Sequence, residues 1–288
     1  MTGAAGLGTC ALLLLGSVLL HFAAEPWRWL LYLGPGGRVT YRQLFAIFAA
    51  ASFGSYILPA KLGIPLRVYL LRRVLLLSLG ELTALLSLDA VIYYGGWTVA
   101  ASVGALLFPV SVEVSAASLV WVAAGGLSVV ALGIWFYQGR VFGRTHSGST
   151  RPRIARVAAE GLAALRQAGV KAVLPSVAVT GVDVLGQSIR HWTLFYLVGH
   201  PLSFEQAFAI TSASIFSGLA SLLPMGLGGY DVVLVLLLGA SGVPVELALL
   251  VPVMNRTITV AISAALGVWG GAELAVSPWG FAKAMRSE

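Results

Sequence analysis

Charged and polar side chains are scarce in this sequence, and several of them stand inside long apolar stretches. Of the 288 residues, 58% are hydrophobic and only 10% are charged. A charged side chain in apolar surroundings is costly, so it calls for a bound ion, a bound ligand or a partner of opposite charge. We take eight such residues as candidate ligand-binding residues: Lys61, Arg67, Asp89, Asp183, Arg190, Tyr230, Asp231 and Arg256.

The cations and the acids of this set predict different chemistry. Lys61 and Arg67 would hold an anion such as a phosphate, and Arg256 could do so from the second half of the chain. The acids would pair with these cations in the empty protein, or would bind a cationic group or a proton. The alternative for each residue is a purely structural ion pair, such as Asp89 with Arg67 or Asp231 with Arg256.

A polar stripe follows one side of the apolar stretch 174–197. Asp183, Gln187 and Arg190 fall at positions i, i+4 and i+7, which a helix places on one face. The sequence therefore predicts a polar stripe on one face of this span.

Other kinds of site find no support in the residue types. The four histidines have no metal-ligand spacing, and the single cysteine, Cys10, excludes an intramolecular disulfide. We find no phosphate-binding glycine loop, no nucleophile elbow and no pair of carboxylates placed for hydrolysis. We therefore predict no catalytic residue, no metal site and no cofactor, and we expect a protein that is not an enzyme. One enzymatic hypothesis remains, in which Asp89 or Asp231 serves as a base at a phosphate.

A short motif, L-P-x-x-L-G, occurs twice and would position these side chains. Proline lacks a backbone donor and glycine permits unusual dihedral angles, so each copy should break a helix. Backbone groups freed inside a membrane need protein, water or a ligand, and a half-helix that begins after the break favours an anion at its N-terminus. The alternative is that the prolines merely kink two packed helices. The break residues are Pro59, Gly63, Pro224, Gly226, Gly228 and Gly229.

The apolar stretches predict an all-α polytopic membrane protein. About 20 residues suffice to span a bilayer. We expect Leu12 to Phe22 to belong to a retained span and not to a signal peptide, because no basic residue precedes it. Trp27, Trp29 and Tyr32 are typical of an interfacial aromatic belt. The five predicted full spans are 5–24, 82–108, 114–137, 174–197 and 246–272.

Two further regions, 41–77 and 205–240, predict re-entrant hairpins. In each, an apolar stretch runs into the repeated motif, and the stretch that follows it is too short to span comfortably. The alternative is that all four hairpin arms are full spans.

The charge distribution predicts the topology. Seven of the 18 lysines and arginines lie between Arg140 and Lys171, against one acid, which indicates a cytoplasmic segment and argues against a nucleic-acid partner for the net charge of +7. The N-terminus then lies outside and the C-terminus in the cytoplasm. The hairpins enter from opposite faces, which is typical of an inverted-topology repeat. We predict an N-terminal membrane half (1–138), a basic amphipathic linker (139–171) and a C-terminal membrane half (172–288).

Several short segments resemble one known family, the transmembrane region of lysylphosphatidylglycerol synthases, which includes the flippase part of the multiple peptide resistance factor. Segment 55–67 is similar to the family's n-x-L-P-x-x-x-G-x-x-x-R motif, and 221–229 to its P-x-G-l-G-x-x-E motif. Asp231 stands where the family has Glu. The chain also looks shorter than its relatives by one N-terminal span and by the soluble aminoacyltransferase domain, so aminoacylation is not implied. The remaining matches are 27–31 with W-R-x-x-L, Asp89 with the acid of the next span, and Gly242, Val243 and Arg256 with the later G-v and R.

The resemblance implies a protein that moves a lipid, or a lipid-linked headgroup, between the leaflets of a prokaryotic plasma membrane. The expected partner is a membrane phospholipid or a polyprenyl or glycolipid, and its anionic headgroup would sit between the hairpin tips. No ATP site is visible, so a gradient, downhill consumption or no energy source would drive the movement. The alternative is a non-transporting scaffold or regulator of a glycosyltransferase or lipid-modifying enzyme, with 139–171 as its working surface.

Overall fold

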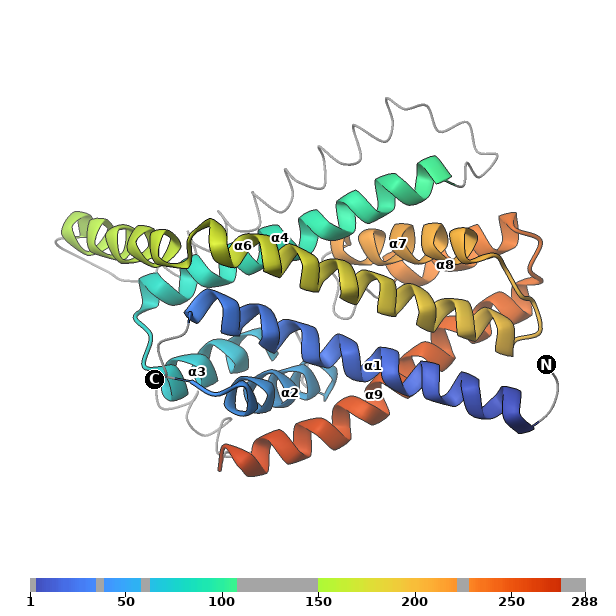
Figure 1. Ribbon diagram of the computed structural model, residues 1–288, viewed down its shortest axis with the longest axis horizontal. Coiled ribbons are helices and arrows are strands. Elements are labelled where there is room, and N and C mark those ends of the chain that lie inside the picture. The colour runs from blue at the N-terminus through green and yellow to red at the C-terminus, as the bar shows by residue number, and fades with distance from the viewer. Residues whose placement is uncertain (1–3, 35–38, 58–62, 108–149, 222–227, 276–288) are drawn as a thin grey trace. The chain divides into compact units, whose positions relative to one another are not determined.

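The computed structural model describes residues 4–34, 39–57, 63–107, 150–221 and 228–275, and over these ranges the secondary structure is helical throughout (Figure 1). The predicted all-α class is therefore confirmed, whereas the predicted span 114–137 lies outside the described ranges. The helices are α1 (Ala4–Leu33), α2 (Tyr41–Ile57), α3 (Gly63–Leu75), α4 (Leu79–Leu107), α6 (Thr150–Leu197), α7 (Phe204–Ala220), α8 (Gly229–Ala240) and α9 (Val245–Glu273).

Four of these helices contain segments that are long and apolar enough to cross a membrane. The segments are Gly6–Leu33, Gly80–Leu107, Lys171–Leu197 and Val245–Glu273. Three of them match predicted spans to within a few residues. The protein is thus a multi-pass membrane protein, and its sidedness stays a prediction.

The first span extends further than the sequence suggested. We expected it to end at residue 24, before Glu25 and Pro26, but α1 continues through Pro26 to Leu33. Proline is tolerated inside membrane helices because neighbouring groups can satisfy the freed carbonyl. Trp29 and Tyr32 are 0% and 4% exposed in the core, so the aromatic belt predicted for them is wrong, while Trp27 is 49% exposed.

Each copy of the repeated motif lies between two short helices, as predicted. Helix α2 ends at Ile57 and α3 begins at Gly63, while α7 ends at Ala220 and α8 begins at Gly229. The two members of each pair pack against each other (Figure 1). Helix α7 opens with a capping box, in which the Ser203 hydroxyl accepts a hydrogen bond from the backbone N–H of Gln206. The re-entrant path of both hairpins stays a prediction.

The chain forms two compact units, and each holds one helix pair. Of the described residues, unit 1 contains those of 4–24, 94–107, 179–221 and 228–264, and so α7 and α8. Unit 2 contains those of 25–34, 39–57, 63–93, 150–178 and 265–275, and so α2 and α3. The core of unit 1 includes Leu194, Phe195, Ile210, Leu234 and Leu238, and the core of unit 2 includes Trp29, Leu44, Phe48, Leu70 and Leu82.

The order of elements repeats along the chain. A long helix, two short helices and a second long helix occur as α1–α4 and again as α6–α9. The short helices measure 17 and 13 residues in the first copy and 17 and 12 in the second, and each copy closes with a helix of 29 residues. This order is what an internal repeat requires, and the predicted domain boundaries and the inverted orientation stay predictions.

Helix α6 is two helices joined at one residue. Gly169 has φ 59° and ψ 177°, a backbone conformation that is essentially restricted to glycine. The predicted linker therefore contains a helix from Thr150 to the residue before this glycine, and residues 139–149 of the linker lie outside the described residues.

Candidate ligand-binding site

An apolar groove in unit 1 ends at an ion pair. The groove has a volume of about 410 Å³ and lies along α8 and α9. At the ion pair, Nη2 of Arg256 donates to both carboxylate oxygens of Asp231, at 2.9 and 2.7 Å. Both side chains are partly exposed, 23% for Arg256 and 29% for Asp231. The lining residues are Asp231, Val232, Val235, Leu236, Leu249, Pro252, Val253 and Arg256.

Asp231 is held by the start of its own helix as well as by Arg256. Gly228 caps α8 with φ 86° and ψ −62°, a left-handed conformation that favours glycine. The backbone N–H of Gly228 donates to Oδ2 of Asp231 at 3.2 Å. A carboxylate in the first turn also suits the positive end of the helix dipole. The N-terminus of α8, which we expected to attract the anion of a ligand, is therefore already served by an acid of the protein itself.

A buried chain of hydrogen bonds lies directly beside this ion pair. Nδ1 of His191 must donate to the carbonyl of Gln187, 2.8 Å away, because a carbonyl only accepts. In the neutral ring, Nε2 then accepts from the hydroxyl of Tyr230 at 2.6 Å. The Tyr230 oxygen in turn accepts from Nδ2 of Asn255 at 3.0 Å. Tyr230 and Asn255 are thus hydrogen-bonded to each other. The residues that follow them in the chain, Asp231 and Arg256, form the ion pair.

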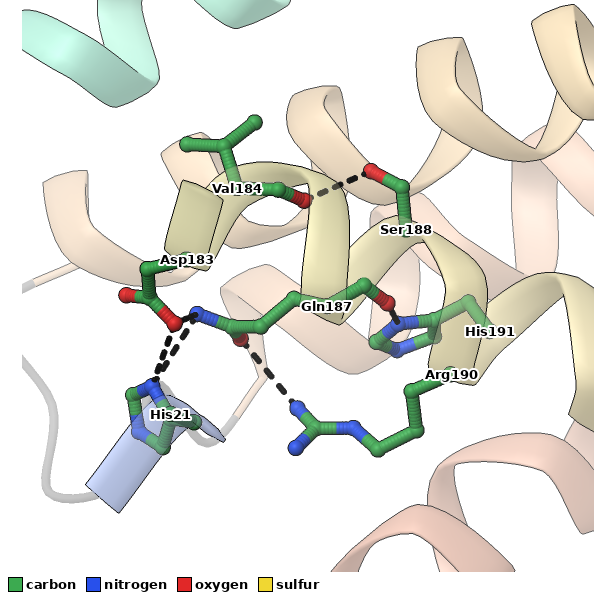
Figure 2. A network of polar contacts seen from close by, with 7 residues as sticks. All are labelled: His21, Asp183, Val184, Gln187, Ser188, Arg190 and His191. Atoms are coloured by element: carbon green, nitrogen blue, oxygen red, sulfur yellow. Dashed lines mark hydrogen bonds and ion pairs between the residues drawn. The ribbon is translucent and has the colours of Figure 1, made fainter. Parts of the chain in front are cut away.

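The predicted polar stripe of α6 forms a network with α1 (Figure 2). Oδ1 of Asp183 lies 2.9 Å from Nδ1 of His21. Nε2 of Gln187 lies 3.3 Å from both of these atoms, and Oε1 of Gln187 accepts from Nη2 of Arg190 at 3.2 Å. Asp183 is 1% exposed and Arg190 3%. The predicted polar stripe of Asp183, Gln187 and Arg190 agrees with this geometry, and His21 is a partner that the spacing could not reveal.

Unit 2 holds a second set of buried charges. Nε of Arg28 donates to Oδ1 of Asp89 at 2.8 Å, and the hydroxyl of Tyr32 donates to the same oxygen at 3.2 Å. The Arg28 guanidinium lies over the ring of Tyr93, 5.2 Å from its centre. Arg28 is only 2% exposed.

Arg67 pairs with Glu25, an acid that the sequence analysis did not single out. Both carboxylate oxygens of Glu25 accept from its guanidinium, Oε1 at 2.5 Å and Oε2 at 3.3 Å, and the guanidinium lies over the ring of Phe48 at 4.9 Å. The suggested pair of Asp89 with Arg67 is therefore wrong, because each has a different partner on α1. The suggested pair of Asp231 with Arg256 is correct.

Seven of the eight candidate residues take part in the polar contacts of unit 1 or of unit 2, which we call the two networks. Unit 1 gathers Asp183, Arg190, Tyr230, Asp231 and Arg256, and unit 2 holds Arg67 and Asp89. Lys61 and the predicted break residues Pro59, Pro224 and Gly226 lie outside the described residues, whereas Gly63 begins α3 and Gly228 and Gly229 begin α8. The residues that sequence reasoning missed are His21, Glu25, Arg28, His191 and Asn255. Their only signal is a polar or ionisable side chain within an apolar stretch.

One family profile matches the chain in the comparison with known proteins. The family profile described as the lysylphosphatidylglycerol synthase TM region matches residues 5–267. No curated protein and no solved structure shows significant similarity to the chain. Membership of this family fits a general role in moving membrane lipid. The match covers most of the chain, both helix pairs and every residue of the two networks, and the chain therefore belongs to the lysylphosphatidylglycerol synthase transmembrane-region family.

Proposed function

We propose that this protein moves a lipid with an anionic headgroup between the leaflets of a prokaryotic plasma membrane, and that it is a transporter and not an enzyme. The observation that carries the proposal is the groove of unit 1, whose apolar walls end at the Asp231–Arg256 ion pair. An amphiphile needs this combination of a long apolar surface and a charged end.

The walls of the groove suit a hydrocarbon chain. Val232, Val235, Leu236, Leu249 and Val253 present aliphatic side chains, and the volume of about 410 Å³ is within the range of small-molecule sites, about 300–1,000 Å³. Val232, Leu236, Leu249 and Val253 are each at least half exposed, so hydrocarbon can reach them from the side.

The charged end of the groove suits a phosphate. Both bonds to Asp231 come from Nη2 of Arg256, and no described residue accepts from Nε or Nη1. A guanidinium can present two parallel donors to a phosphate. Arg256 could therefore bind a headgroup through Nε and Nη1 while Nη2 keeps its contact with Asp231.

The test is lipid inversion in vesicles that contain the purified full-length protein and NBD-labelled phosphatidylglycerol. The double variant Asp231→Asn/Arg256→Gln keeps a hydrogen-bonded, neutral pair, and it should lose inversion together with the co-purified lipid that native mass spectrometry detects in the wild type. Arg42→Ala is the control, because this arginine is 68% exposed and remote from the groove in the chain. It should behave as wild type.

Inversion at the wild-type rate by the double variant would refute the groove as the lipid site. Wild-type protein that carries no lipid and inverts none would favour the alternative, a scaffold for a glycosyltransferase or a lipid-modifying enzyme. In that case, neutralising the basic residues of 139–171 should abolish function while the double variant remains active.

A further inference from the structure

His21 and Asp183 lie near the midpoints of two candidate membrane spans. Asp183 is one residue from the midpoint of Lys171–Leu197, residue 184, and His21 is within two residues of the midpoint of Gly6–Leu33. Neither is part of the groove. We propose that His21 and Asp183 form a proton-binding site that couples lipid movement to a proton gradient. This inference rests on the proposed function and names its driving ion.

The contact between the two side chains requires a proton. Nδ1 of His21 and Oδ1 of Asp183 are 2.9 Å apart, and two atoms that both carry only lone pairs would repel at this distance. One proton must therefore lie between them, on the nitrogen or on the oxygen. Nε2 of Gln187 is 3.3 Å from both atoms and can donate a hydrogen bond to whichever of the two does not carry the proton.

Arg190 keeps the Gln187 amide in the orientation that this role demands. Its Nη2 donates to Oε1 of Gln187, so that the amide nitrogen is turned toward His21 and Asp183, as Figure 2 shows. The side chains of His21, Asp183 and Arg190 carry 0, −1 and +1 when one proton is shared. The cluster is then neutral, and a second proton, on Nε2 of His21, makes it +1.

That second proton has no counter-charge in the cluster. The side chain of His21 is 29% exposed while that of Asp183 is 1% exposed, so His21 is the member of the pair that is open to an incoming proton. No described residue bonds its Nε2. The neighbouring titratable groups are already engaged: His191 bonds through both nitrogens to Gln187 and Tyr230, and Asp231 and Arg256 neutralise each other.

The groove can supply the missing negative charge. Gln187 connects the two places, because its side chain bonds His21 and its carbonyl bonds His191, which continues to Tyr230 and Asn255. Asp231 and Arg256 are the next residues after Tyr230 and Asn255. Charges interact strongly across an apolar interior. An anionic headgroup at Arg256 thus favours the second proton, and the proton favours the headgroup to the same degree.

One proton per lipid predicts an electroneutral cycle. The proton binds Nε2 of His21 from the acidic side together with the anionic lipid, and both leave on the alkaline side, where Nε2 gives its proton back to water. A gradient of one pH unit corresponds to a tenfold ratio of proton activities, so the labelled lipid should reach a ratio of about ten between the leaflets.

The experiment measures this ratio. Vesicles of phosphatidylcholine with NBD-labelled phosphatidylglycerol carry the purified full-length protein and a gradient of one pH unit, and dithionite reports the lipid of the outer leaflet. Protein-free vesicles correct for redistribution caused by the gradient alone. We expect accumulation of about tenfold on the alkaline side with the wild type and none with His21→Gln or Asp183→Asn. His200→Gln is the matched control, since His200 follows the span Lys171–Leu197.

Each outcome decides between the two proposals. If the wild-type protein inverts the probe equally with and without the gradient, proton coupling is overturned and lipid transport still stands. The same conclusion follows if both His21→Gln and Asp183→Asn respond fully to the gradient. Wild-type protein that inverts no probe at any pH would overturn the proposed function and proton coupling with it. Elution volume and melting temperature in detergent identify a variant that has failed to fold, and the other variant then decides.

Discussion

At the scale of single residues, Arg28 shows what a charge within an apolar chain requires. It is 2% exposed, it bonds Asp89 through Nε, and it lies over the ring of Tyr93. A carboxylate, a hydroxyl from Tyr32 and an aromatic face together replace much of the water that the two charges have lost. A buried pair of this kind is costly to split, because the charge that remains has no counterpart.

Removal of one member of this pair should therefore destabilise the protein strongly. We expect Asp89→Asn to lower the free energy of unfolding in detergent by about 3–5 kcal/mol. Arg42→Ala provides the comparison, since its pair with Glu273 is 68% and 29% exposed and should contribute less than about 1 kcal/mol. Equal melting temperatures for the two variants would show that the Arg28–Asp89 pair contributes little to the stability of the protein.

Tyr230 is a second residue whose contribution to stability can be predicted, because its hydroxyl makes two hydrogen bonds. In Tyr230→Phe, Nε2 of His191 and Nδ2 of Asn255 each lose their bond to this oxygen. A buried polar group left without a partner costs about 1–3 kcal/mol. Thr257→Val, an exposed change on α9, the helix of Asn255, should stay within about 0.5 kcal/mol of wild type. Chemical denaturation followed by tryptophan fluorescence would compare them.

Sequence reasoning found some of the acids and bases and only one of the pairs. The pair of Asp231 with Arg256 was suggested and is present. Arg28 with Asp89, Arg67 with Glu25 and His21 with Asp183 join residues 61, 42 and 162 positions apart. No periodicity links such distant positions, since their contact depends on how helices pack.

At the scale of elements, hydropathy predicted the limits of the helices well, but charged residues suggested the wrong end for α1. The limits of α2, α3, α7 and α8 fall close to the predicted hairpin arms because proline and glycine mark the breaks directly. The end of α1 was placed nine residues too early, since Glu25 and Arg28 look like surface residues when their partners are unknown.

The close approach of α7 and α8 gives a prediction at this scale. A Cβ added at Gly218 would lie 2.8 Å from Cβ of Tyr230, closer than such atoms can come. We expect Gly218→Ala to cost about 1–3 kcal/mol by overpacking. Gly239→Ala on α8 meets no atom within 4 Å and should be neutral or stabilising by up to about 1 kcal/mol. Thermal unfolding that ranks the two variants in the reverse order would contradict this packing.

At the scale of the whole molecule, the predicted re-entrant hairpins can be tested by labelling. Cys10 is the single cysteine of the chain, so Cys10→Ser gives a background for introduced cysteines. With the first hairpin entering from the cytoplasm, Ala60→Cys should resist a membrane-impermeant maleimide added outside intact cells. Glu246→Cys should react there, and Ser147→Cys only in inside-out vesicles. Outside labelling of Ala60→Cys would mean that the arms cross the membrane completely.

The glycine within α6 has a consequence for how this chain fits a bilayer at all. A continuous helix of 48 residues would be about 72 Å long, more than twice the hydrocarbon thickness of about 30 Å. Of that length, the part before Gly169 accounts for about 28 Å. An unbroken helix would carry this part straight on, beyond the surface of the bilayer. Gly169 interrupts the helix instead, so a single residue without a side chain allows the basic helix to turn away from the axis of the span.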